Sequence, residues 1–358
     1  MSGVDEVRVG RALLWNFDTN QHRIADPDLL NRVKELIAMY RERGRDPLRG
    51  AAIHDVGVVA VGSEDFRRLG EKEFQEVQEL RYILFLCCLA SNTRLGHNGA
   101  HMMVTAENFD VIRQNFVLDS DYLAEQTGVL ISMTVMGYRI RETRFIRPAY
   151  VNRPTRFRYD ERLLSQLKLL RSVNRQLYRR LTRAAAVFLE SYYNSPRVDV
   201  RARVVLQVAA FEILLDLPEQ QPRKAFKDAV ERLLSDSGER RYRYKFQMGD
   251  RKVWESRTIK GIWADRLYTL RNHIAHGETI PQREYEFRGR QHHLVISPLM
   301  FVSCTKRLLE AALESSSKCR PFFERIVWGQ IRPADEYDEE LRGFQIQEDF
   351  ARRFAGTR

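Results

Sequence analysis

Three residues near position 275 carry side chains that could act together on a phosphate group. Arg271 and Asn272 are adjacent, and His276 follows four residues after Asn272. A histidine can accept or donate a proton near neutral pH. An arginine binds phosphate oxygens through its planar fork of N–H donors. The set therefore indicates proton transfer beside a bound phosphate.

A predicted helix over residues 261–276 has to position these side chains. At about 100° per residue, its apolar stripe consists of Trp263, Leu267, Leu270 and Ile274. His276 falls about 180° from Leu267 and so points away from that stripe. Asn272 lies about 40° from His276, one turn earlier, and the long stem of Arg271 can carry its guanidinium to the same face.

The spacing between Arg271 and His276 is not specific by itself. It also occurs between Arg49 and His54 and between Arg288 and His293, but neither of those pairs has a helical context. A second interpretation needs no chemistry, because cationic side chains and glycine are both favoured at a helix C-terminus. Under that interpretation His276 and Gly277 simply end the helix. Both interpretations remain open at the level of residue spacing.

Residues 263–277 (WADRLYTLRNHIAHG) and the earlier segment 211–215 (FEILL) resemble the HEPN superfamily of helical-bundle proteins. They are especially similar to its Apea-like branch. The family signature is an Arg, a polar residue that is often Asn, and then a His late in the bundle. Arg271, Asn272 and His276 match it, and Glu212 resembles an acidic residue often found on the second helix. The resemblance covers residues 156–320.

The resemblance implies a homodimer that cleaves RNA without a metal, at a composite site formed by two motifs. His276 would handle the proton of the RNA 2′-hydroxyl or of the leaving oxygen, and Arg271 would stabilise charge on the phosphate. Asn272 would orient the histidine or hold the phosphate, with Glu212 in a supporting role. Such proteins often act as RNA-degrading toxins or effectors in prokaryotic antiviral defence, restrained until a regulatory protein or a nucleotide triggers them. The alternative is a non-catalytic module that binds RNA or protein.

A segment that alternates cations and aromatics precedes the site helix. It consists of Arg240, Arg241, Tyr242, Arg243, Tyr244 and Lys245. Such a segment can hold single-stranded RNA by pairing with phosphates and stacking on bases. Strict alternation is equally typical of a hairpin strand with one buried face. The two interpretations are compatible with each other.

Positive charge is concentrated in two stretches of this basic chain. The formal net charge is +11, from 59 Lys and Arg against 48 Asp and Glu. Residues 139–183 hold 14 basic and 3 acidic side chains, and residues 223–260 hold 12 and 6. Clustered cations are the electrostatic signature of a phosphate-backbone binder, although solvated helix faces also produce such runs. The charge by itself leaves nucleic-acid binding and solvated helix faces equally open.

Cofactor motifs are missing from the sequence. There is no Walker-type or dinucleotide-type glycine loop, so neither ATP nor NAD is expected. His97 and His101 are spaced as zinc ligands can be, but a third ligand is not evident, and no metal is expected. The four cysteines lack disulfide or metal spacing, there is no spanning apolar run, and the N-terminus lacks a signal-peptide pattern. These features predict a cytoplasmic protein without a membrane segment.

The elements divide the chain into an α+β arrangement. Residues 1–155 are expected to form a mixed α/β domain that senses a signal or binds a partner. Its predicted elements are a helix after Asp26, a strand at 56–61, a helix at 73–89 and strands within 128–150. Residues 156–330 are expected to form an all-α, HEPN-like bundle, and residues 331–358 a charged tail.

Five helices are predicted in that bundle. They are a long stripe from Leu163 to Phe188, a helix around 204–215, a short one around 226–233, the site helix at 261–276, and one that follows Pro298. The segment 284–296 alternates and is predicted to be a small hairpin decorated by His292 and His293.

Overall fold

The computed structural model describes the chain in thirteen stretches. They are residues 6–41, 57–61, 70–92, 106–109, 111, 114–116, 123–125, 145–146, 158–193, 198–235, 238–248, 251–287 and 291–314. The chain divides into two compact units, Met1–Phe85 with Thr105–Arg158, and Leu86–Val104 with Tyr159–Arg358. The described residues combine many helices with small sheets, so the protein is broadly α+β.

The first unit contains a three-stranded antiparallel sheet. Its strands are β1 (Glu6–Val9), β2 (Ala12–Asn16) and β4 (Gly57–Val61), in the order β1-β2-β4. The β1–β2 turn contains Gly10 at a φ of 60°, a conformation that favours glycine. Strand β4 confirms the strand expected at 56–61. Alternate residues of β1 and most of β2 are buried, which places a small apolar core on this sheet.

Helices and short strands complete the first unit's described residues. They are η1 (Gln21–Arg23), α1 (Pro27–Met39), α2 (Glu71–Asn92, which continues into the second unit), β3 (Tyr40–Arg41), η3 (Ala106–Phe109), β5 (Gln114–Phe116), β6 (Leu123–Glu125) and β7 (Phe145–Ile146). Helices α1 and α2 confirm the two helices expected here. Of the strands expected within 128–150, only β7 is described, and the rest lies outside the described residues.

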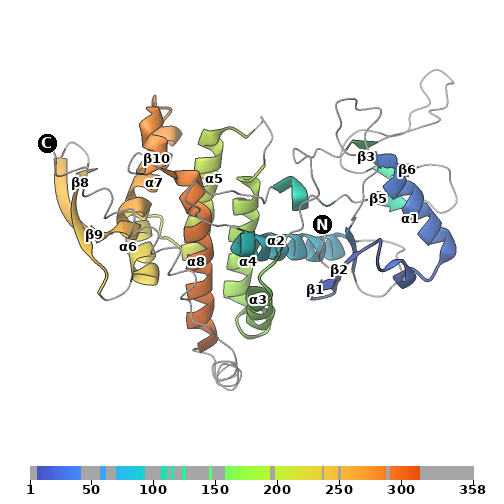
Figure 1. Ribbon diagram of the computed structural model, residues 1–358. Coiled ribbons are helices and arrows are strands. Elements are labelled where there is room, and N and C mark those ends of the chain that lie inside the picture. Colours follow the sequence, from blue (N-terminus) through green and yellow to red (C-terminus); the bar gives the residue numbers. More distant parts are fainter. Residues whose placement is uncertain are drawn as a thin grey trace. The chain divides into compact units, whose positions relative to one another are not determined.

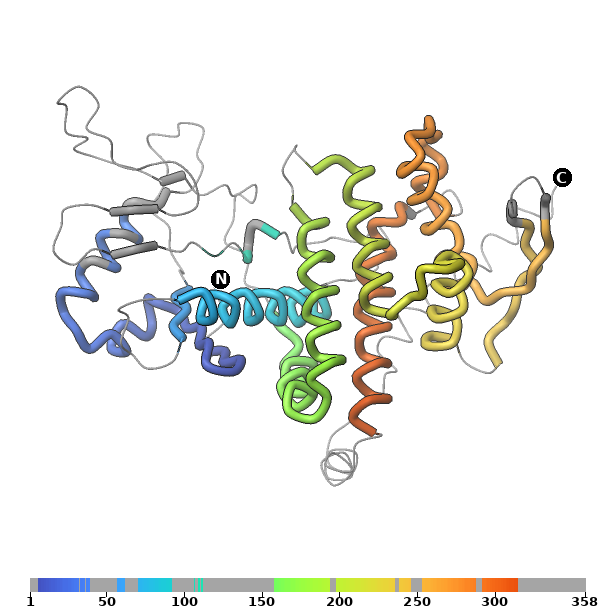
Figure 2. The backbone as a smooth tube through the Cα atoms, turned by 180° about the vertical axis from the view of Figure 1, so that it is seen from behind, coloured from blue at the N-terminus to red at the C-terminus, as the bar shows by residue number. Residues whose placement is uncertain are grey.

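The second unit is mainly helical (Figure 1). Its elements are α3 (Glu161–Val173), α4 (Arg175–Glu190), α5 (Val200–Leu215), α6 (Pro222–Leu234), β8 (Arg241–Met248), β9 (Arg251–Thr258), α7 (Ile259–Ala275), η4 (Gln282–Tyr285), β10 (Glu286–Phe287), β11 (Gln291–His292) and α8 (His293–Glu314). Helices α4, α5 and α8 lie side by side, and the β8–β9 hairpin lies next to α6 (Figures 1 and 2).

Aromatic rings join the helices of the second unit in one core. Phe188 of α4 stacks on Phe301 of α8, with ring centroids 4.1 Å apart. Phe211 of α5 lies edge-on to Trp263 of α7 at 5.9 Å and packs against Phe226 of α6 at 5.3 Å. All five side chains are buried. Large buried rings of this kind dominate core energetics, so this cluster fixes where α7 lies relative to α5 and α6.

The single long helix expected over Leu163 to Phe188 was wrong, because Asn174 divides it into α3 and α4. The backbone of Asn174 is non-helical, with φ −142° and ψ 81°, and its side chain accepts a hydrogen bond from the backbone N–H of Leu177. That is an N-cap, which starts a new helix. Each helix buries its own apolar residues, Leu163, Leu167 and Leu170 on α3 and Leu177, Leu181 and Phe188 on α4, at spacings that run on across the break, so spacing alone did not reveal it.

The start expected for the last helix was also wrong. Helix α8 begins at His293 and contains Pro298, whereas the hairpin before it is limited to the two-residue strands β10 and β11. Proline removes one backbone donor from the helix interior. Burial of His293, Leu294 and Ile296 accompanies the helical turn before Pro298. Tertiary packing thus overrides the local proline signal.

Candidate functional site

Helix α7 carries the site, and both of its ends are defined by side chains or backbone geometry that the sequence specifies. Thr258 is the N-cap, and its hydroxyl accepts a hydrogen bond from the N–H of Gly261. At the other end the N–H of Gly277 bonds to the carbonyl of Ile274, and that of Glu278 to the carbonyl of His273. These two bonds are a Schellman motif, which requires a left-handed residue at Gly277. Its φ is +72°.

The faces of α7 agree with the helical wheel. Trp263, Leu267 and Leu270 are buried in the core, whereas His276 is exposed. His276 occupies the C-cap, and its backbone N–H bonds to the carbonyl of Asn272. The imidazole is therefore presented to solvent at the end of a rigid, buried helix.

Arg271 lies in a cluster of side chains from α5 and α7. Its guanidinium carbon lies 5.6 Å from the ring centroid of Tyr268, and one terminal nitrogen is 4.0 Å from Oε1 of Glu212. The hydroxyl of Tyr268 donates a hydrogen bond of 2.5 Å to the same oxygen of Glu212. The other terminal nitrogen of Arg271 donates to Oδ1 of Asn272 at 3.2 Å. Glu212 and Asn272 are thus both partners of Arg271.

The surroundings hold Arg271 in place and leave it able to bind an anion. Burial raises the pKa of Tyr268, and its hydrogen bond to Glu212 raises it further, so the phenol keeps its proton at neutral pH. The Arg271 side chain is 31% exposed, although its Nε is buried and has no hydrogen-bond partner among the described residues. A guanidinium has five N–H donors, four of them on the two terminal nitrogens. The donors of the terminal nitrogens that are not used inside the chain can bind phosphate oxygens.

The structure separates His276 from this cluster within one chain. Its imidazole forms no hydrogen bond or ion pair with Arg271, Asn272 or Glu212 among the described residues, although those three lie together. The neighbouring His273 is engaged instead, with Nδ1 3.2 Å from Oε2 of Glu284. Within one chain Asn272 and Glu212 both contact Arg271. The expectation that they would support the histidine stays a prediction.

Sequence reasoning missed Tyr268. The residue precedes Arg271 by three positions, a spacing that places two side chains on neighbouring turns of a helix. From that spacing alone, a contact between Tyr268 and Arg271 could have been predicted. Its bond to Glu212, 56 residues earlier, has no local signature.

The other two Arg–His pairs lie wholly or partly outside the described residues. Arg49, His54 and Arg288 lie outside the described residues, as do His97 and His101. The expectation that His293 decorates a hairpin was wrong, because it starts α8 and is 1% exposed. Burial lowers the pKa of His293 to about 3, with smaller contributions from His292 and Arg266. A neutral, buried imidazole of this kind serves the core.

Residues 241–245 of the alternating segment begin strand β8, as one of its two interpretations predicted, and Arg240 directly precedes the strand. Its inner face packs against α6 and α7, where Tyr244 is buried and its hydroxyl donates to Glu255 at 3.4 Å. Arg241 pairs with Glu231 of α6 at 2.9 Å. Arg240 lies over the Tyr242 ring at 5.2 Å, and Arg243 and Lys245 are exposed. The six expected RNA-binding residues therefore lie on different sides of one strand.

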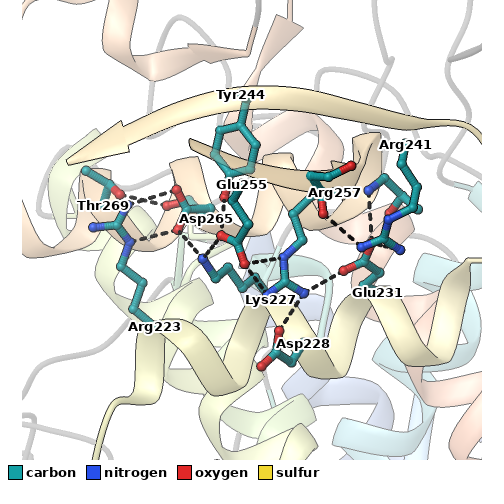
Figure 3. Close-up of polar contacts among 12 residues, drawn as sticks. Arg223, Lys227, Asp228, Glu231, Arg241, Tyr244, Glu255, Arg257, Asp265 and Thr269 are labelled. Carbon is teal, nitrogen blue, oxygen red and sulfur yellow. Dashed lines mark hydrogen bonds and ion pairs between the residues drawn. The ribbon is translucent and has the colours of Figure 1, made fainter. Parts of the chain in front are cut away.

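An ion-pair network neutralises many of the cations in the stretch 223–260 (Figure 3). Asp265 of α7, 1% exposed, accepts two hydrogen bonds of 2.8 Å from Arg223 of α6. Lys227 pairs with Glu255 of β9. Arg257 pairs with Glu255, Glu231 and Asp228. Figure 3 shows these groups between α6, α7 and the hairpin, so much of this positive charge holds the hairpin on the helices.

The network also sets the ionisation of its central carboxylate. Burial disfavours the charged form of Glu255, but hydrogen bonds from Lys227 and Arg257 outweigh it, so the pKa of this carboxyl lies below its ordinary value. Glu255 therefore stays charged at neutral pH and remains a partner for both cations.

The described residues contain no group of three or more His, Cys, Asp or Glu that could hold a metal ion. Within the same residues, no helix combines the length and apolar character needed to cross a membrane. Cys87, Cys88 and Cys304 are buried free thiols. Burial raises the pKa of all three, to about 12 for Cys88 and Cys304, so they are poor nucleophiles.

Comparisons with known proteins give no relative. No protein-family model matches the chain, and neither a curated protein nor a solved structure matches it. Function therefore has to be argued from the residues of α5, α7 and the hairpin.

Proposed function

We propose that the protein is a metal-independent endoribonuclease whose reaction is carried out by Arg271 and His276. The observation that carries the proposal is the fixed position of Arg271. Tyr268 and Glu212 hold its guanidinium beside the end of α7, where the exposed imidazole of His276 projects from the C-cap. A cation and a titratable group at one helix end are the two parts that phosphodiester transfer requires.

The proposed reaction uses the RNA's own 2′-hydroxyl. His276 takes the proton of that hydroxyl, or gives one to the departing 5′-oxygen. The 2′-oxygen bonds to phosphorus while the bond from phosphorus to the 5′-oxygen breaks, which leaves a 2′,3′-cyclic phosphate and a 5′-hydroxyl. Arg271 neutralises the charge that builds on the phosphate oxygens, and Asn272 holds Arg271 through its amide oxygen.

The separation of His276 from Arg271 within the chain favours a composite site. The imidazole of His276 is exposed and forms no hydrogen bond or ion pair with the cluster among the described residues, so a second copy of α7 facing the first could supply the missing partner. The resemblance of residues 263–277 to the HEPN superfamily supports this homodimer. By the same resemblance we propose an RNA-degrading toxin or effector in prokaryotic antiviral defence, controlled by a regulatory protein or a nucleotide.

The test is cleavage of end-labelled single-stranded RNA in the presence of EDTA. We expect 2′,3′-cyclic phosphate ends, no cleavage of DNA of the same sequence, and loss of cleavage in Arg271→Ala and His276→Ala. His273→Gln is the matched control, because His273 lies on the same helix but is engaged with Glu284. A His276→Ala protein that cleaves at the wild-type rate would overturn the assignment.

One observation favours the second candidate, a non-catalytic module that binds RNA or protein. The Schellman motif accounts for Gly277 and for the position of His276 without any chemistry. RNA that is bound but left intact by the wild-type protein, with and without EDTA, would favour this module over the nuclease.

A further inference from the structure

The β8–β9 hairpin has a second face that the ion-pair network does not use. Residues directly opposite each other in an antiparallel pair share a face. Tyr244 pairs with Glu255 on the inner face, and the next pair along is Lys245 with Trp254. Tyr244 is buried, whereas Lys245 and Trp254 are exposed. The hairpin therefore has one face on the helices and one face in solvent.

Trp254 stands out on that solvent face. Its side chain is 53% exposed, and among the described residues the only other exposed large hydrophobic side chain is Val200, at 44%. A tryptophan usually finds partners for its large apolar ring, so exposure of half its surface forgoes a sizeable burial energy. By contrast, the aromatic rings of the core formed by α5, α6 and α7 are buried.

Two cations lie over the Trp254 ring and have no carboxylate partner among the described residues. The guanidinium carbon of Arg243 lies 5.0 Å from the ring centroid, and Nζ of Lys245 lies 5.7 Å from it. By contrast Arg257, on the inner face, and Arg241, at the start of β8, are both in ion pairs. The outer face thus combines the half-exposed ring of Trp254 with two cations that form no ion pair among the described residues.

Unpaired nucleotides fit this combination. A base is a flat ring that stacks on an indole, and the phosphates beside it pair with Lys and Arg. A duplex would offer phosphates but keep its bases stacked inside, so it would leave the indole unused. An acidic peptide would use the cations but has no general need for the exposed ring.

We propose that Trp254, Arg243 and Lys245 form a binding platform for single-stranded nucleic acid, in which one base stacks on Trp254 and its neighbouring phosphates contact the two cations. The platform rests on the proposed function, because it gives the RNA substrate a place to be held. The platform includes Trp254, which lies outside the 240–245 segment. Within that segment, Arg241 and Tyr244 contact other parts of the chain and are not part of the platform.

The test is fluorescence anisotropy of a labelled 12-nucleotide RNA with the full-length His276→Ala protein, so that cleavage does not interfere. We expect Trp254→Ala to weaken binding about tenfold or more, because one stacked base contributes strongly to affinity. Trp254→Phe should retain most of the affinity, since it keeps a ring. Val200→Ala is the matched control, an exposed apolar side chain on α5, and should bind as the parent does.

Three further arms identify the ligand. Arg243→Gln with Lys245→Gln should reduce the slope of log affinity against log salt by about 1.4, the value for two phosphate contacts on a single strand. Single-stranded DNA of the same sequence should bind comparably, because stacking does not need the 2′-hydroxyl. A duplex of the same length should bind more weakly and should not respond to Trp254→Ala.

The result that would overturn the platform is unchanged RNA affinity in Trp254→Ala protein whose circular dichroism and thermal unfolding match the parent. Unchanged affinity together with a loss of self-association in sedimentation would reassign this face to a protein partner. The proposed nuclease activity is tested by a different measurement, cleavage by the wild-type protein. Absence of cleavage in the wild-type protein, with Trp254-dependent binding retained, rejects the proposed function and leaves the platform standing.

Discussion

The hydroxyl of Tyr268 donates a 2.5 Å hydrogen bond to Oε1 of Glu212, and the ring of the same tyrosine lies under the guanidinium of Arg271. One side chain thus links the carboxylate of α5 to the arginine of α7. Arg271 is held from two sides, by a charge at Glu212 and by an aromatic face at Tyr268. This relationship makes the proposed role of Arg271 testable without removing Arg271.

Tyr268→Phe should lower the rate of RNA cleavage about tenfold while leaving the ring in place. The change removes the donor to Glu212 and lets the carboxylate move relative to Arg271. A tenfold change in rate corresponds to about 1.4 kcal/mol, near the lower end of the roughly 1.5–3 kcal/mol of a hydrogen bond to a charged group. The measurement is kcat and KM for a short RNA. We expect the fall in kcat, since Arg271 acts on the charge that develops during the reaction. Glu212→Gln should reproduce the effect, and unchanged kcat in both variants would contradict this positioning role.

Arg223→Ala should destabilise the second unit by about 2–3 kcal/mol. It removes both hydrogen bonds from the buried carboxylate of Asp265 and leaves only Lys227, whose Nζ is 3.8 Å away. Urea unfolding followed by circular dichroism gives the free energy change. Arg180→Ala is the matched control, because its partner Asp216 is 74% exposed and such pairs contribute only about 0–1 kcal/mol. Equal losses in the two variants would show that burial of Asp265 does not set the cost.

Gly277→Ala should cost about 1–2 kcal/mol of stability through the backbone alone. A Cβ at position 277 would meet no atom within 4 Å, but the φ of +72° is unfavourable for a residue with a Cβ. Thermal unfolding measures the loss. Gly238→Ala is the control, because a Cβ there also meets nothing and its φ is outside the left-handed region. A Gly277→Ala protein as stable as Gly238→Ala would show that the Schellman motif does not hold the end of α7.

His293 should make the protein less stable as the pH falls from about 6 to about 4. Burial lowers the pKa of His293 to about 3 in the folded protein, against roughly 6.5 in an unfolded chain. Between these values the unfolded state binds a proton that the folded state does not, so the free energy of unfolding falls by about 1.4 kcal/mol per pH unit. The dependence is absent above about pH 6.5.

His293→Gln isolates this contribution, because carboxylates titrate in the same window in both proteins. Urea midpoints at several pH values should show a shallower acid loss for the variant than for the wild type. His292→Gln should change the slope less, since burial also lowers the pKa of His292 but that side chain is only half-buried. Parallel curves for wild type and His293→Gln would contradict the prediction.

Features that depend on consecutive residues could be read from the sequence. The stripe through Leu267 and the glycine at 277 specify which face α7 buries and where it ends, whereas the start expected at 261 lies two residues after the actual start at Ile259. The alternation after Arg241 likewise specified strand β8. These signals are local because caps, helical faces and strand pleats are set by backbone geometry over a few residues.

Where local signals conflicted with packing, the sequence misled. The stripe from Leu163 to Phe188 continues through Asn174 although the helix does not, and Pro298 suggested a start that burial of His293 overrode. Both errors arise because the same apolar residues are compatible with more than one local backbone path, and only their fit against other helices selects one.

The chain's chemistry-bearing residues and its excess of positive charge were evident from the sequence alone. What the charges do was decided by tertiary structure. Arg223 meets Asp265 across 42 positions, and Tyr268 meets Glu212 across 56. Arg243 and Lys245, the two neighbours of Tyr244 along β8, have no carboxylate partner among the described residues and lie over the ring of Trp254. Ion pairs form between groups that folding brings close together. A count along the chain therefore identified the cations. Only the packing of α5, α6 and α7 determined which of those cations are neutralised and which can bind a ligand.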